Sequence, residues 1–138
     1  MGLFKKEKNE KIESVEKVFL RISGMRITQE FEIIFAQDRA EISEYRMYCA
    51  EGGGWERRLE KSAVCPAEEF LNLMNECEIL SWDGFYGKHP RGVHDGEMFL
   101  FQATVNGGRE IRAEGSQNFP KHYREFRNAV YDRLYERN

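Results

Sequence analysis

The sequence predicts an α+β domain, a two-layer sandwich in which a mainly antiparallel sheet carries two helices on one face. Four segments with strand-like alternation precede the first helix pattern. Glycine-containing hairpin signals at Gly52–Gly54 and Asn106-Gly107 join neighbouring strands. Only two segments have helical spacing, so helices do not alternate one for one with strands as in a doubly wound parallel sheet. The predicted element order is ββββαββα.

The four N-terminal strands are predicted from the alternation of apolar and polar residues. The first strand begins at Val15, and the second and third occupy about 27–35 and 41–50. The fourth begins at Trp55 and is polar on both faces. Because charge on an outer strand discourages aggregation, this fourth strand is expected at an edge of the sheet.

The two helices are predicted from apolar residues at three- and four-residue spacing. Pro66 is expected in the first turn of the first helix and Pro120 at the first position of the second, where a missing N–H costs nothing. Leu80 extends the stripe of the first helix. The remaining stripe residues are Phe70, Leu73, Met74 and Cys77 in the first helix, and Tyr123, Phe126, Val130 and Leu134 in the second.

The core is predicted where these helix stripes meet the sheet. The strand from Met98 to Val105 is apolar on both faces over its first half, so it is expected to be central in the sheet. The side chains expected to be buried together are Phe31, Ile33, Phe70, Leu73, Leu100, Phe126 and Val130.

Length and charge fit one domain that does not bind nucleic acid. Of the 138 residues, 14–138 are predicted to form a single α+β domain, with 1–13 as a flexible N-terminal tail. The net charge of −3 gives no electrostatic basis for contact with nucleic acid, which calls for a clearly basic domain.

A cytoplasmic location is predicted from three features. The cysteines Cys49, Cys65 and Cys77 are odd in number and widely spaced, which is typical of reduced thiols. No apolar run is long enough to span a bilayer. The charged N-terminal segment has no apolar core, so it does not resemble a secretory signal.

The segment Ser81–Gly96 is the strongest candidate for function. Long loops without structure of their own are usually functional or disordered, and the three aromatic residues here argue against disorder. Its first part, from Trp82 to Phe85, is expected to anchor the loop to the core. The middle, from Tyr86 to His94, is the part expected to be exposed. Asp95-Gly96 is expected to form the turn before the next strand.

The preferred function is a non-catalytic, cytosolic binding domain that uses this 81–96 loop to contact another protein. The candidate binding residues are Tyr86, Lys88, His89, Arg91 and His94. Aromatic residues and arginine are enriched where proteins bind partners. The prediction includes no cofactor, no resident metal and no catalytic residue.

The alternative is a metal-assisted or acid–base enzyme. It requires His89, His94 and Asp95 to converge, with His122 as a further candidate ligand. Imidazole and carboxylate groups suit zinc and other divalent ions, but this spacing matches no established zinc pattern. No nucleophile elbow and no His-Glu-x-x-His motif is present.

Three motifs in the C-terminal half occur together in a known order. They are Trp82-Asp83-Gly84-Phe85, Asp95-Gly96 before a strand, and Gly115-Ser116 followed by Phe119-Pro120. This order resembles small bacterial proteins and lipoprotein domains of uncharacterised function that carry Trp-x-Gly-Phe, Asp-Gly and Gly-Ser-Asn-x-Phe/Tyr-Pro. Gln117 stands where that pattern has Asn. The resemblance supports the fold expected for this half of the chain and implies no activity.

Overall fold

The computed structural model describes residues 10–24, 27–88, 91 and 96–136. The strands are β1 Val15–Ser23, β2 Thr28–Ala36, β3 Arg39–Cys49, β4 Trp55–Pro66, β5 Tyr86–Gly87, β6 Met98–Val105 and β7 Arg109–Ser116. The helices are α2 Ala67–Glu76, the short 3₁₀ helix η2 Ile79–Trp82, and α3 Tyr123–Tyr135. The α+β class is confirmed. The predicted order is confirmed in part, because η2 and β5 stand between α2 and β6.

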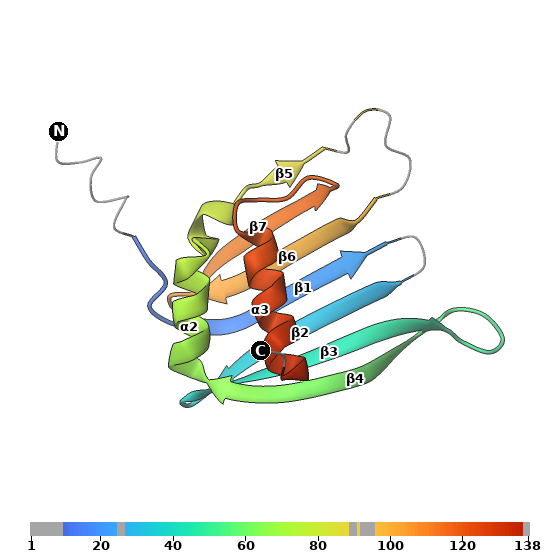
Figure 1. The fold of residues 1–138 in the computed structure, drawn as a ribbon, viewed down its shortest axis with the longest axis horizontal. Coiled ribbons are helices and arrows are strands. Elements are labelled where there is room, and N and C mark those ends of the chain that lie inside the picture. The colour runs from blue at the N-terminus through green and yellow to red at the C-terminus, as the bar shows by residue number, and fades with distance from the viewer. Residues whose placement is uncertain (1–9, 25–26, 89–90, 92–95, 137–138) are drawn as a thin grey trace.

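The strands form one mixed sheet in the order β4-β3-β2-β1-β6-β7-β5 (Figure 1). Neighbouring strands are antiparallel except β5, which is parallel to β7. β1 lies in the middle and joins the β2–β4 meander to the β6–β7 hairpin. The expected edge position of β4 and the interior position of β6 are both confirmed.

Both α-helices lie in front of the sheet on the same face in Figure 1. Alternate strand residues point toward them, and the buried core contains Phe31, Ile33, Phe70, Leu73, Phe126 and Val130, as expected. Leu100 was wrongly placed in this group. It pairs with Arg21 and Glu114 across the sheet and is only half-buried, because it lies on the face without helices. We call this uncovered surface the open face.

The helices begin and end differently from the sequence expectation. Glu78 adopts left-handed backbone angles, with φ of 55°, so α2 ends before it and Leu80 belongs to η2. His122 also has a positive φ, of 67°, and α3 therefore starts at Tyr123, not at Pro120. Among the described residues, no helix is long and apolar enough to cross a membrane.

The segment before β1 is packed against the body of the domain. Ile12 is buried in the core, and its backbone N–H donates to Oδ1 of Asn75 on α2 at 2.9 Å. The Asn75 side chain in turn donates to the carbonyl of Ile12 at 2.9 Å. Residues 1–9 of the predicted tail lie outside the described residues, and the boundary at residue 13 stays a prediction.

A buried carboxylate joins α3 to the sheet. Glu44 of β3 is fully buried on the helix-covered face. It accepts hydrogen bonds from Nε2 of Gln29 at 2.8 Å, from Nε of Arg46 at 3.2 Å, and from the hydroxyl of Tyr135. Burial, and then the hydrogen bond with Glu44, raise the pKa of Tyr135 to about 12, so this hydroxyl stays protonated and donates.

Candidate functional site

Trp82 anchors the 81–96 segment to the core. Its side chain is fully buried, and its ring meets Phe101 of β6 edge-on at a centroid distance of 5.0 Å. The indole Nε1–H donates to the carbonyl of Lys121, just before α3, at 2.9 Å. Phe85 is half-buried and packs beside Phe99. The expected anchoring role of this part of the loop is therefore confirmed.

Asp83 and Gly84 turn the chain from η2 onto the edge of the sheet. Oδ1 of Asp83 accepts the backbone N–H of Arg112 at 3.0 Å, and the N–H of Gly84 donates to the Arg112 carbonyl at 2.9 Å. Gly84 has φ of +84°, a conformation that favours glycine. After Phe85, Tyr86 and Gly87 form β5, and Tyr86 pairs with Glu114 of β7. This register places the Tyr86 side chain on the open face.

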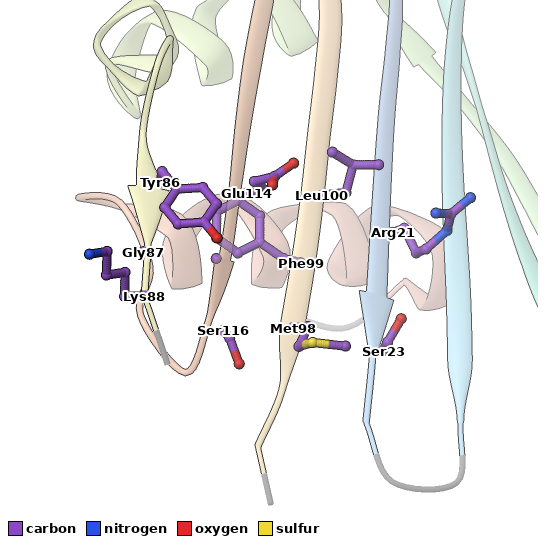
Figure 2. A pocket seen from close by; sticks show the side chains of 11 residues that line it. Arg21, Ser23, Tyr86, Gly87, Lys88, Met98, Phe99, Leu100, Glu114 and Ser116 are labelled. Carbon is purple, nitrogen blue, oxygen red and sulfur yellow. The ribbon is translucent and has the colours of Figure 1, made fainter. Parts of the chain in front are cut away.

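A hollow of about 380 Å³ lies on the open face beside Tyr86 (Figure 2). Tyr86 is 67% exposed, and it stands with Lys88 on one side of the hollow. Arg21 of β1 lies on the other side, and Met98 and Leu100 of β6 lie between. The hollow thus has an apolar floor with one cationic side chain at each end.

A second hollow, of about 450 Å³, continues along the same face. It shares Arg21 and Leu100 with the first hollow, and Phe19 adds an aromatic ring to its lining. Lys17 and Glu110 also contribute. Together the two hollows extend over β1, β6 and β7, so this half of the open face is concave over several strands.

Most charges on the open face are already paired. Nε of Arg21 lies 3.0 Å from Glu30, and Arg57 of β4 contacts both Glu30 and Glu32 at 2.7 Å. The Arg57 guanidinium lies 3.6 Å above the ring centre of Tyr45. A charged side chain that already forms an ion pair within the protein binds a charged ligand less strongly than an unpaired one. This network therefore favours contact with a mixed polar and apolar surface over contact with a polyanion.

Exposed apolar side chains gather on the open face. Eight large apolar residues in the described part of the chain are exposed, and six of them lie there: Ile34, Trp55, Leu59, Val64, Tyr86 and Met98. The pairing of β3 with β4 shifts by one residue at Glu60, so that Leu59 and Val64 share one face. Apolar residues concentrated on one face are typical of an interaction surface.

The predicted binding residues divide into two groups. Tyr86 and Lys88 line the first hollow, and no ion pair joins Lys88 to another described residue. Arg91 is exposed. His89 and His94 lie outside the described residues, so their part in a binding surface stays a prediction.

The enzyme alternative gains no support from the described residues. His89, His94 and Asp95 lie outside them, and elsewhere in the described chain no group of three His, Cys, Asp or Glu side chains could hold a metal ion. His122 lies before α3 and contacts Glu78 and Glu125, not the hollow. The hydrogen bond that the His122 ring donates to the Glu125 carboxylate is the main cause that raises the pKa of His122.

The cysteines give no sign of a nucleophile. Cys65 and Cys77 are buried, and Cys49 is exposed near the end of β3. Burial raises the pKa of the Cys77 thiol to about 11, which keeps it protonated at neutral pH. Cys77 therefore acts as a small apolar side chain of the core, as its place on the α2 stripe indicates.

Sequence reasoning missed the residues that complete the hollow. Met98, Leu100 and Arg21 belong to strands that looked like ordinary parts of the sheet. One signal was available: Leu100 follows Phe99 and precedes Phe101 in a segment that is apolar on both faces. When the helices cover one face only, the second apolar face of such a strand must lie on the surface or beneath a partner.

Comparisons with known proteins do not assign the chain to a family. No family model matches the chain, and no curated protein and no solved structure gives a match. The resemblance of the C-terminal motifs to small bacterial domains stays a prediction.

Proposed function

We propose that the protein is a non-catalytic, cytoplasmic binding domain that contacts another protein through the open face around Tyr86 and through the loop that follows. The hollow beside Tyr86 is the observation that carries the proposal. It combines the exposed ring of Tyr86 with an apolar floor. Lys88, which has no ion pair with a described residue, lies at one end, and the half-exposed Arg21 lies at the other. Tyrosine, methionine and arginine are the residue types enriched in protein interfaces.

The side chains that line the hollow support a role in binding a partner over a role in catalysis. Glu114 is the single acidic side chain among the described residues that line the hollow, and it lies 2.9 Å from Nη2 of Arg112. No described histidine or cysteine lines the hollow. Both hollows lie on the open face and span several strands, an arrangement that suits an extended segment or a side-chain cluster of a protein.

Affinity capture with immobilised protein tests the proposal. Tyr86→Ala removes the exposed ring and is expected to reduce the recovered partner at least tenfold, a size typical of an interface anchor. Lys88→Ala is expected to act in the same direction with a smaller effect. Arg124→Ala changes an exposed residue of α3, on the helix-covered side, and serves as the control.

The capture results are compared only among variants that are shown to be folded. Circular dichroism must show the same spectrum and melting behaviour for all variants, because Tyr86 is too exposed to carry core packing. Equal capture by wild type and Tyr86→Ala, or capture that Arg124→Ala reduces equally, would reject the hollow as the contact surface.

A further inference from the structure

The outer edge of β4 is the longest unpaired strand edge in the described part of the chain. β4 has 12 residues and pairs with β3 alone, whereas β5 at the opposite edge has 2. Twelve extended residues span about 40 Å. The unpaired N–H and C=O groups of an edge strand are a template for another strand. β4 therefore offers a docking edge on both sides of the register shift at Glu60.

Charges that usually protect such an edge are engaged within the same chain. Arg57 reaches across β3 to the two β2 glutamates described above. Arg58 pairs with Glu56 of its own strand at 2.7 Å. Glu60 accepts a hydrogen bond from the hydroxyl of Tyr48. Arg57 and Glu60 are thus directed toward neighbouring strands of their own sheet, and Arg58 and Glu56 neutralise each other, which weakens the protection that these charges give the edge.

The same strand exposes three large apolar side chains on the open face. Trp55 is 68% exposed, Leu59 56% and Val64 60%. Arg57 lies between Trp55 and Leu59 in the sequence, but its guanidinium is drawn inward over Tyr45.

β4 is complementary to an antiparallel copy of itself. A two-fold axis through the midpoint of the strand passes between Glu60 and Lys61, and places each opposite the other in the second copy. Val64 of the second copy then stands opposite Arg57 and diagonal to both Trp55 and Leu59, within the reach of cross-strand contacts. No two like charges are directly opposed in this register. A foreign strand would have to supply this match, whereas a second copy already contains it.

We propose that two copies of this chain join through β4, antiparallel about this two-fold axis, to form one continuous sheet. Such an isologous contact uses the same surface on both copies, as two-fold dimers do. The hollow beside Tyr86 lies at the opposite end of each sheet, so the contact leaves it free. The dimer presents two hollows, and a partner with two matching sites binds it more tightly than one copy.

Charge reversal at the two-fold axis tests the pairing. Wild-type protein is expected to dimerise in sedimentation equilibrium over a concentration series. Glu60→Lys and Lys61→Glu each bring like charges together twice, and each is expected to raise the dimer Kd about tenfold or more. An equimolar mixture of the two variants is expected to dimerise again, since opposite charges then meet at both positions. Arg124→Glu, on the outside of α3, is the control.

The mixture separates pairing from loss of structure. If a variant fails to dimerise because it is misfolded, mixing it with the other variant does not restore dimerisation. If it fails because like charges meet across the strands, the mixture dimerises. The proposal is overturned if wild type is monomeric throughout, if the single variants dimerise as tightly as wild type, or if the mixture stays monomeric. Tyr86→Ala is expected to keep the wild-type dimer constant, so this test stands apart from that of the hollow.

Discussion

Replacing Trp82 by Phe tests whether this residue fixes the loop to the core. The variant loses the hydrogen bond from the indole to the Lys121 carbonyl, worth about 1 kcal/mol. It also leaves a small void against Phe101 and Phe126, which costs about 1 kcal/mol more. The expected loss in the free energy of unfolding is therefore about 2 kcal/mol. Urea titration followed by circular dichroism measures it.

Trp55→Phe is the matched control for this experiment. Trp55 is the other tryptophan of the chain and is largely exposed in the single chain, so at concentrations where the protein is monomeric its replacement is expected to change the free energy of unfolding by less than about 0.5 kcal/mol. With Trp82 as the single tryptophan, that control protein should resist quenching by acrylamide. A Trp82→Phe cost below about 0.5 kcal/mol, or quenching of Trp82 as strong as that of Trp55, would refute the reasoning.

Three further predictions concern groups away from the hollow. Glu44→Ala leaves three hydrogen-bond donors without their acceptor, so urea titration should show a free energy of unfolding that is lower by about 2 kcal/mol. An unchanged free energy of unfolding would contradict the network. Because the pKa of His122 is raised in the folded protein, its protonated ring stabilises the fold below about pH 6.5, and this stabilisation is lost as pH rises through the raised pKa. The difference in free energy of unfolding between wild type and His122→Asn should therefore disappear at alkaline pH. A difference that does not change with pH would refute this. A thiol reagent should modify Cys49 in the folded protein, and Cys65 and Cys77 only on unfolding; equal rates would contradict the burial.

The sequence patterns predicted the layers well because burial repeats along each element. Val18, Leu20 and Ile22 point toward the helices as their alternation indicates, and the Asn106-Gly107 hairpin lies where both residues adopt positive φ, 51° and 78°. The polar character of β4 correctly placed it at the sheet edge. Local chemistry sufficed for these features, because each depends on neighbours in the chain.

Features that depend on distant partners were not predictable in this way. Glu44 points inward among polar and aromatic neighbours because Tyr135, ninety-one residues later, supplies its hydrogen bond. The shortened α2 and the late start of α3 follow from left-handed angles at Glu78 and His122, a backbone conformation that is uncommon outside glycine. The hollow needs β1, β5, β6 and β7 in register, and their order in the sheet cannot be read from periodicity.

The central position of β1 has a consequence for how the chain is made. β1 is the first strand in the described part of the chain, and its partners lie on opposite sides: β2 follows at once, whereas β6 begins at Met98. During translation the β1–β4 meander emerges with one edge of β1 unpaired until β6 is available. An unpaired edge in an incomplete chain invites aggregation. Truncation before β6 should therefore promote aggregation in addition to removing the hollow, because it leaves this edge of β1 permanently unpaired.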